Sequence, residues 1–174
     1  MTKELNIALI GCGNWGKNIA RNLYQMGSLA CIYDTNIKLS KKLSYEYSLP
    51  ILELTKIFED QNINAIVISS PAITHKDIAV EALKNDKDVF IEKPFCLSLP
   101  DAQKLSELAS NKNRILMVGH LLNYHNAFIK MKELVRKGKI GVPQNIRANR
   151  LALGSIRSEE SVVYDLSAHD ISMI

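Results

Sequence analysis

The sequence predicts an α/β fold built on a doubly wound parallel sheet over roughly residues 1–120. Five apolar runs of strand length, rich in Ile, Val, Leu and Ala, alternate with segments of helical period; they are 5–10, 29–34, 63–70, 88–93 and 114–119. Because these runs lack polar alternation, they suit strands covered on both faces, as in a parallel sheet. Glycines follow the first run directly. Strand, turn and helix then repeat in the order of a doubly wound domain.

Apolar residues three or four positions apart predict the helices between these runs, since such residues share one helical face. The sets are Ile19, Leu23 and Met26, then Ile78, Ala79, Ala82 and Leu83, and then Ala102, Leu105, Leu108 and Ala109. Asn14 is the expected N-cap of the first helix, and Ser98 or Asp101 the expected start of the helix around Pro100.

The pattern changes near residue 121. An amphipathic helix is predicted by Phe128, Met131, Leu134 and Val135, and residues 143–154 alternate like a strand with one wet face, which is typical of antiparallel sheets. A lone strand cannot form a sheet. We therefore expect residues 1–120 to be one domain and residues 121–174 to be the start of a second, incomplete α/β domain with an antiparallel sheet. Such a sheet is completed either by further chain or by a partner.

Composition narrows the function classes. The formal net charge of +4 is modest and its lysines are scattered, so we expect no nucleic-acid partner. The three cysteines lie neither at CxxC spacing nor in a Cys/His cluster, so no disulfide framework and no metal site are expected. No run approaches the roughly 20 apolar residues of a membrane span, and the N-terminus lacks a signal-peptide pattern. These features favour a cytoplasmic protein without a membrane partner.

The chemistry begins at the glycines after the first run. Gly11, Gly13 and Gly16 have GxGxxG spacing between a strand and a helix, and Asp34 ends the second run 18 residues after Gly16. Such glycines let main-chain N–H groups and a helix N-terminus reach a pyrophosphate, while the carboxylate accepts hydrogen bonds from ribose hydroxyls. A carboxylate also repels a 2′-phosphate, so NAD is favoured over NADP. The alternatives are a simple tight loop for the glycines, and a turn or helix-cap role for Asp34.

Two further segments end strands at the same predicted edge. Ser69, Ser70 and Pro71 are expected to line the cofactor crevice, with His75 near the N-terminus of the following helix. Taken alone, His75 is better explained as a capping or surface histidine. The second of these segments, Glu92-Lys93-Pro94, places a lysine where it can donate to a substrate hydroxyl or take part in a proton relay. Its simpler interpretation is an ordinary charged strand end.

Together these motifs resemble the Gfo/Idh/MocA family of nicotinamide-dependent sugar and polyol dehydrogenases. The resemblance rests on GCGNWG, Asp34, SSPAITH, EKP, KGKIG and DLSAHD in this order. It implies a Rossmann domain followed by a substrate domain with a large open sheet, a small-molecule sugar substrate, and a homo-oligomeric full-length protein. The cofactor-binding residues it implies are Gly11, Gly13, Asn14, Trp15, Gly16, Asp34, Ser69, Ser70, Pro71, His75, Glu92 and Lys93.

The resemblance also implies a catalytic set. Lys93 matches the lysine of EKP, and Asp165 and His169 match a D-x-x-x-H pair, which an α-helix places on one face. A histidine that titrates near neutral pH suits a general base for alcohol oxidation. His169 is therefore the expected base, with Lys93 hydrogen-bonding the reacting oxygen and Asp165 positioning substrate or base. The alternative is a helix start with Asp165 as its N-cap and His169 on a solvated face.

The substrate class is carried by the resemblance alone. The later segments resemble the branch that acts on nucleotide-linked amino sugars, of the UDP-N-acetylglucosamine or UDP-glucuronate 3-dehydrogenase kind. Arg147, Arg150 and Arg157 can serve a diphosphate or simply be wet-face charges. The sequence departs from the family pattern at Ser172, where an acid is common, and lacks the arginine common near position 123. We expect hydride transfer from a secondary sugar hydroxyl to NAD; the alternative is a dinucleotide-binding module without turnover.

Overall fold

A computed structural model describes residues 5–150, 161 and 163–174 of the chain. The chain divides into two compact units, Met1–Val118 and Gly119–Ile174. Each unit is described by itself below. None of the described helices is both long and apolar enough to cross a membrane.

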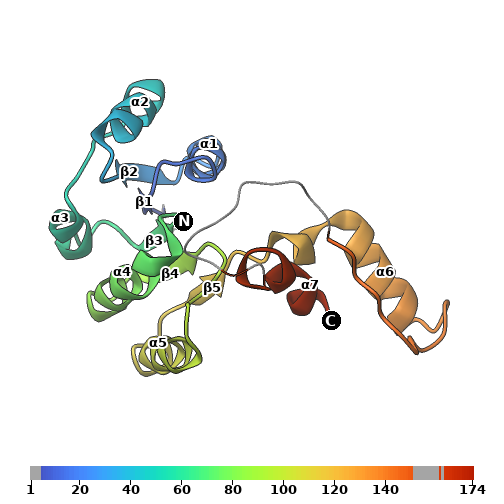
Figure 1. The fold of residues 1–174 in the computed structure, drawn as a ribbon. Coiled ribbons are helices and arrows are strands. Elements are labelled where there is room, and N and C mark those ends of the chain that lie inside the picture. Colours follow the sequence, from blue (N-terminus) through green and yellow to red (C-terminus); the bar gives the residue numbers. More distant parts are fainter. Residues whose placement is uncertain (1–4, 151–160, 162) are drawn as a thin grey trace. The chain divides into compact units, whose positions relative to one another are not determined.

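The first unit is built on a parallel sheet of five strands (Figure 1). The strands are β1 (Ile7–Ile10), β2 (Leu29–Tyr33), β3 (Ala65–Ile68), β4 (Asp88–Ile91) and β5 (Leu116–Val118). They lie in the order β2-β1-β3-β4-β5, and every neighbouring pair is parallel. The chain thus leaves β1 for β2 on one side and returns to β3 on the other, which confirms the doubly wound topology.

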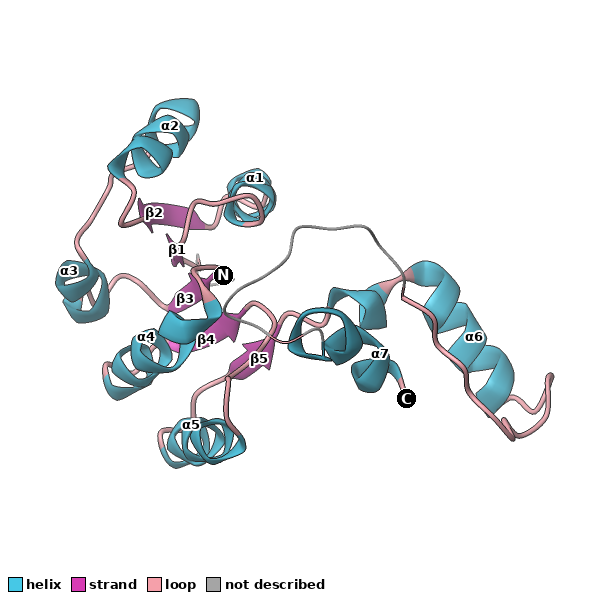
Figure 2. Cartoon of the chain, in the orientation of Figure 1, coloured by secondary structure: helices cyan, strands magenta, loops and turns pink. Residues whose placement is uncertain are grey.

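Helices cover both faces of this sheet (Figure 2). They are α1 (Gly16–Gln25), α2 (Ile37–Tyr47), α3 (Leu54–Glu59), α4 (Ala72–Lys84) and α5 (Leu99–Asn111). Helices α1 and α2 lie on one face, and α3, α4 and α5 on the other (Figure 1). The short α3 has no counterpart among the predicted helices, because its six residues are too few to show a helical period.

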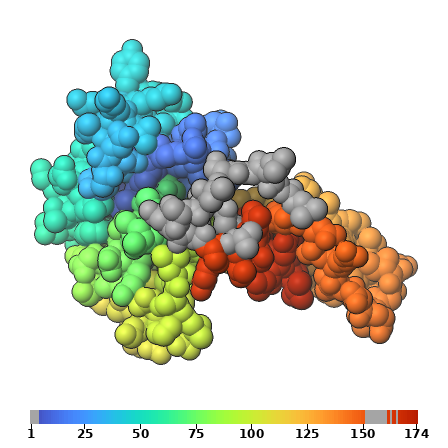
Figure 3. All heavy atoms as spheres, in the orientation of Figure 1, coloured from blue at the N-terminus to red at the C-terminus, as the bar shows by residue number. Residues whose placement is uncertain are grey.

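Strand residues alternate between two apolar clusters because successive side chains point to opposite faces of a sheet. In β1, Ala8 and Ile10 enter the cluster under α3, α4 and α5, whereas Ile7 and Leu9 enter the cluster under α1 and α2. All four β1 residues are buried, as expected for a central parallel strand. In the space-filling view the blue, green and yellow segments of the first unit pack into one continuous body (Figure 3).

The predicted helix starts have two different outcomes. Ser98 is the N-cap of α5, and its hydroxyl accepts a hydrogen bond from the main-chain N–H of Asp101, as predicted. The prediction for α1 is wrong, because Trp15 rather than Asn14 occupies the N-cap position and makes no side-chain cap bond. The glycine loop delays the first helical residue to Gly16.

The regular elements of the second unit are all helical over its described residues. It contains a 3₁₀ turn, η1 (Leu121–Tyr124), then α6 (Asn126–Arg136), a π turn, η2 (Val163–Ser167), and α7 (Ala168–Met173). The strand predicted over 143–154 is not found: residues 143–150 form no strand, and 151–154 lie outside the described residues. An isolated segment with strand-like alternation has no neighbour to complete its hydrogen bonds, so the pattern alone does not make a sheet.

Candidate functional site

The carboxyl ends of the three central strands are in register. Ile10 pairs with Ile68, and Ile68 pairs with Ile91. The ladder continues one residue further, since the N–H of Ser69 donates to Ile10 O (2.8 Å) and that of Glu92 donates to Ile68 O (2.9 Å). The glycine loop, the serine segment and the Glu92-Lys93-Pro94 segment therefore leave the sheet side by side. This edge, where the strand order reverses, is where ligands bind in open α/β sheets.

Gly11 and Gly16 are required by the packing of the glycine loop. Gly11 has a φ of +98°, and a Cβ there would lie 2.5 Å from Ser70 N. A Cβ on Gly16 would overlap the carbonyl oxygen of Gly11. Ser69 adds a contact from the neighbouring strand, because its hydroxyl donates to Gly11 O (2.7 Å). The loop is therefore closed against its own helix and against the serine segment.

Gly13 differs from these two glycines. A Cβ on Gly13 would meet no atom within 4 Å. Packing within the protein thus gives no reason for a glycine here. The space that a Cβ would fill lies beside the start of α1, where the unpaired main-chain N–H groups of a helix attract an anion.

Asp34 is held against the glycine loop by main-chain donors. Its Oδ2 accepts the N–H of Cys12 (2.6 Å) and its Oδ1 accepts the N–H of Asn36 (2.7 Å). Each carboxylate oxygen has a further lone pair, so the group can still accept hydrogen bonds from two hydroxyls. Burial, and to a lesser degree the Asp34 charge, raises the pKa of the Cys12 thiol to about 12. Cys12 therefore stays a neutral thiol behind the loop.

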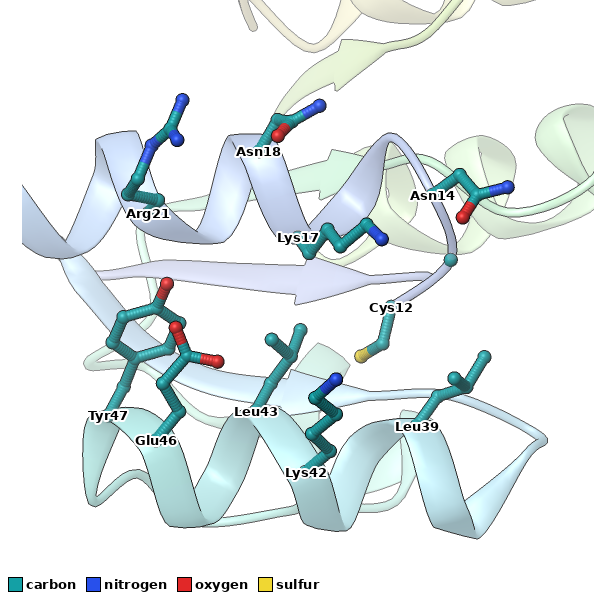
Figure 4. Close-up of a pocket in the computed structure, with 11 residues that line it drawn as sticks. Cys12, Asn14, Lys17, Asn18, Arg21, Leu39, Lys42, Leu43, Glu46 and Tyr47 are labelled. Carbon is teal, nitrogen blue, oxygen red and sulfur yellow. The ribbon is translucent and has the colours of Figure 1, made fainter.

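A hollow of about 410 Å³ lies beside the loop, between α1 and α2 (Figure 4). Lys17 from α1 and Lys42 from α2 extend into it, over an apolar floor formed by Leu39 and Leu43. Gly13 and Asn14 form its rim. The two ammonium groups add positive potential next to the helix N-terminus, which favours a phosphate-bearing ligand at the loop.

The Glu92-Lys93-Pro94 segment is tied to the glycine loop by Trp15. The indole Nε1–H of Trp15 donates to Glu92 Oε1 (2.5 Å), and the N–H of Lys93 donates to Glu92 Oε2 (3.3 Å). Burial raises the pKa of the Glu92 carboxyl above its usual value, although both hydrogen bonds oppose this shift. The Lys93–Pro94 peptide bond is cis. Lys93 therefore follows an anchored carboxylate at the end of β4.

The structure places His75 near the start of α4, as expected, but gives its side chain contacts different from the expected ones. Its side chain is only 1% exposed, and its ring nitrogens lie 2.9 Å from two main-chain carbonyl oxygens, those of Ser70 and Pro94. No ring nitrogen is left for a cofactor, and the ring neither caps α4 nor lies on the surface. Pro71, in contrast, is exposed at the N-cap position of α4, and Ser70 contacts Thr74 through its hydroxyl (2.7 Å).

In the second unit, His169 lies in the first turn of α7 with 9% of its side chain exposed. Its ring meets the ring of His120 edge to face, with 6.4 Å between centroids. Burial lowers the pKa of His120 below its ordinary value. His169 is thus buried. The simpler interpretation of DLSAHD, which places His169 on a solvated face, is wrong.

The expected pairing of Asp165 with His169 on one α-helical face needs correction. Asp165 lies in the π turn η2, and Ser167 rather than Asp165 occupies the N-cap position of α7. The four-residue spacing therefore does not run along a single α-helix. The side chain of Asp165 lies outside the described residues.

The three arginines predicted to serve a diphosphate differ in their surroundings. Arg150 forms a two-pronged ion pair with Asp170, whose Oδ1 and Oδ2 accept from its Nη2 (2.8 Å) and Nε (3.1 Å). The bond to Asp170 raises the pKa of Arg150, and the same bond holds the pKa of Asp170 below its usual value. Arg147 is exposed, and Arg157 lies outside the described residues. Sequence reasoning missed Asp170, which directly follows His169.

The family assignment comes from comparison of the sequence with known families. Residues 5–120 match the family GFO_IDH_MocA, described as "Oxidoreductase family, NAD-binding Rossmann fold". The chain belongs to the Gfo/Idh/MocA oxidoreductase family. Its first unit is the NAD-binding Rossmann fold of that family, which confirms the expected cofactor class.

Curated relatives within this family act on different substrates. The chain is similar to myo-inositol 2-dehydrogenase of Thermotoga maritima (27% identity over 97% of this chain and 53% of the relative) and to UDP-N-acetylglucosamine 3-dehydrogenase of Acidithiobacillus ferrooxidans (26%, 98% and 53%). It is also similar to 2,7-anhydro-N-acetylneuraminate hydratase of Escherichia coli (28%, 79% and 37%). The chain thus spans about half or less of the length of these relatives.

A solved structure supports the fold. The "NAD-binding protein from Listeria innocua" superposes with a TM-score of 0.88 at 20% identity, over 98% of this chain and 54% of that one. At this identity the likeness shows the fold alone.

Two departures from the Gfo/Idh/MocA pattern contact each other. The amide Nδ2 of Asn123, near which the resemblance implied an arginine, donates to the hydroxyl of Ser172 (3.2 Å), where the resemblance implied an acid. The Ser172 hydroxyl in turn donates to the main-chain oxygen of His169 (2.7 Å). A neutral pair therefore stands beside His169. The sequence signalled both positions separately but gave no sign that they meet.

Proposed function

We propose that this chain contains the cofactor domain, residues 1–120, and the beginning of the substrate domain, residues 121–174, of an NAD-dependent dehydrogenase. The enzyme transfers a hydride from a secondary hydroxyl of a sugar or cyclic polyol to the nicotinamide. The observation that carries this proposal is the edge at which the glycine loop, Asp34 and Lys93 leave neighbouring strands together. The full-length protein is proposed to be a homo-oligomer acting on a small molecule.

The residues at this edge fit NAD. Gly13 leaves open space at the start of α1 for the pyrophosphate, and Asp34 is held where its free lone pairs can accept from the adenosine ribose. The carboxylate disfavours a 2′-phosphate at the same place, which supports NAD over NADP. Ser69, Ser70 and Pro71 line the crevice between β1 and β3. When bound, NAD supplies the hydride acceptor.

Alcohol oxidation requires removal of the hydroxyl proton as hydride leaves carbon. His169 takes that proton in this proposal, because a neutral imidazole is a base near neutral pH. Lys93 donates a hydrogen bond to the reacting oxygen and stabilises the negative charge that develops there. Asp165 orients substrate or base.

The substrate proposed is a sugar, with a UDP-linked amino sugar or uronate as the finer candidate. Its support is the similarity to a UDP-N-acetylglucosamine 3-dehydrogenase and the exposed guanidinium of Arg147, which matches phosphate oxygens. Arg150 is a weaker candidate for a diphosphate because Asp170 already occupies two of its donors. Because some relatives act on inositols, unsubstituted cyclic polyols are candidate substrates as well and are tested alongside the sugars.

The proposal is tested by following reduced-nicotinamide absorbance in the protein expressed from its complete reading frame. A panel of inositols, free sugars and UDP-sugars is offered with NAD and separately with NADP. We expect turnover with at least one panel member and a higher kcat/KM with NAD. Absence of turnover with every member would count against a dehydrogenase and favour the second candidate.

That second candidate is NAD binding without turnover. It is favoured by one observation: the described part of the second unit contains helices but no sheet on which a substrate site can be built. Calorimetry on residues 1–174 measures NAD binding directly. Binding by this chain together with turnover in the longer protein supports the dehydrogenase; binding with no turnover in either supports a binding module.

Asp34→Ala is expected to weaken NAD binding by about 10–100-fold, since the main-chain donors at Cys12 and Asn36 and the ribose hydroxyls lose a charged acceptor. The preference for NAD over NADP should fall by at least about tenfold in the same variant, because the repulsion of a 2′-phosphate is removed. Calorimetric Kd values for both cofactors measure this. Asp77→Ala, which removes an exposed acid from α4, is the control and should leave both values unchanged. An unaltered preference in Asp34→Ala would remove Asp34 from the cofactor site.

A further inference from the structure

The contacts of the buried His75 do not fit the cofactor-binding role that the resemblance implied for it. His75 lies in the first turn of α4, with 1% of its side chain exposed, and it contacts no open part of the crevice. Burying an imidazole costs free energy unless its nitrogens are hydrogen-bonded. Each lies 2.9 Å from a carbonyl oxygen, and the two oxygens belong to two different loops.

These two carbonyls belong to the segments that follow β3 and β4. Nε2 faces the oxygen of Ser70, and Nδ1 faces the oxygen of Pro94. Carbonyl oxygens only accept, so a ring nitrogen donates in either contact only when it carries the proton, and which nitrogen does so depends on the tautomer. The imidazole is thus a spacer of fixed length between the serine segment and the residue after Lys93.

The neighbours of Lys93 are therefore anchored on both sides. Before it, the N–H of Glu92 donates to Ile68 O in the sheet ladder, and the Glu92 carboxylate accepts from the Trp15 indole. After it, Pro94 is buried and its oxygen faces His75. With the main chain fixed at positions 92 and 94, the direction in which Lys93 leaves β4 is set.

We propose that His75 is a positioning residue, which fixes the main chain after Lys93 against the serine segment and so aims Lys93 along the crevice. The proposal rests on the proposed role of Lys93 in hydride transfer. It differs from a purely stabilising role for His75 in one respect. The bond to Pro94 matters for Lys93, whereas the bond to Ser70 mainly anchors the ring.

Two conservative variants separate the bonds. The amide nitrogen of asparagine lies near the position of the histidine Nδ1, and that of glutamine near the position of Nε2. His75→Asn therefore places an N–H donor facing the oxygen of Pro94, and His75→Gln places one facing the oxygen of Ser70. Both remove an imidazole and leave a similar void, so both are expected to lower Tm.

Trp15 reports the position of this segment without any need for turnover. It is the single tryptophan of the chain, and its indole donates to Glu92. We expect His75→Gln to shift its emission to longer wavelength and to increase acrylamide quenching, and His75→Asn to stay close to wild type. Glu92→Ala gives the emission of an indole without this acceptor. Equal changes in the two His75 variants would show a stabilising role only and overturn the proposal.

A matched control tests whether loss of stability alone moves Trp15. Lys87, 2% exposed, donates to Asp60 O (2.6 Å) from the residue before β4, at the opposite end of the strand. Lys87→Met should lower Tm and leave Trp15 emission unchanged; a shift in this variant would overturn the proposal.

In the active full-length enzyme, His75→Gln should lower kcat by about 10–100-fold, the cost of a misplaced group, with the KM for NAD nearly unchanged. His75→Asn should recover most of that loss. If Trp15 responds as expected and wild-type protein has no turnover, the proposed function fails and the positioning of the segment by His75 stands. If wild type turns over and the two variants have equal kcat, the positioning role fails.

Discussion

Lys93→Ala is expected to lower kcat by about 10²–10⁴-fold, the range found when a general acid or an oxyanion donor is removed. The ammonium is proposed to donate to the oxygen that gains negative charge as its proton leaves, so its loss acts on the transition state more than on binding. Lys93 is only partly buried and its main chain is held by neighbouring residues, so the free energy of unfolding should change by about 0.5 kcal/mol or less. Steady-state kcat and KM, together with a thermal melt, measure both effects.

Two further variants make the Lys93 result specific. Lys93→Arg keeps the positive charge but replaces a compact ammonium by a planar fork, and it should recover only a small part of kcat. Lys104→Ala removes an exposed lysine from α5 and should leave kcat unchanged. If Lys93→Ala retains wild-type kcat with the same pH profile, Lys93 has no part in the reaction.

The first unit could be predicted closely from the sequence because its determinants are local. A parallel strand buried on both faces has a sequence of uninterrupted apolar residues. All five observed strands lie within the apolar runs predicted to be strands. The edge of the sheet that Gly11, Asp34 and Lys93 share follows from strand order, since the carboxyl ends of parallel strands lie at one edge. Family membership required the order of several motifs rather than any one of them.

The errors come from contacts that sequence spacing cannot encode. His75 was placed correctly near the start of α4, but which loops its ring joins depends on the main-chain path after β3 and β4. The α-helical face expected for Asp165 and His169 fails because a π turn precedes α7. Strand-like alternation in residues 143–150 meets no neighbouring strand, and a periodic pattern needs a partner before it becomes a sheet.

Gly13→Ala and Gly16→Ala should have opposite consequences, although both place one methyl group in the same loop. In Gly16→Ala the new Cβ overlaps the main-chain oxygen of Gly11, which cannot rotate away, so we expect unfolding to become easier by on the order of 3 kcal/mol or more. In Gly13→Ala the Cβ meets no protein atom within 4 Å, and Gly13 is not among the positive-φ glycines. Its free energy of unfolding should change by less than about 0.5 kcal/mol.

The open space at Gly13 makes the same variant a test of cofactor binding. If the pyrophosphate approaches the main chain there, the alanine methyl group takes its place, and the Kd for NAD should rise by at least about tenfold. Chemical denaturation and calorimetry on residues 1–174 give both numbers, so neither depends on turnover or on the second unit. Gly27→Ala, at a glycine with open space but in the turn after α1, is the control for a methyl group distant from the loop. It is expected to lose some stability because its φ is +68°, with the affinity for NAD unchanged. Tight NAD binding by a stable Gly13→Ala variant would mean that the dinucleotide does not approach this loop, whatever the spacing of its glycines.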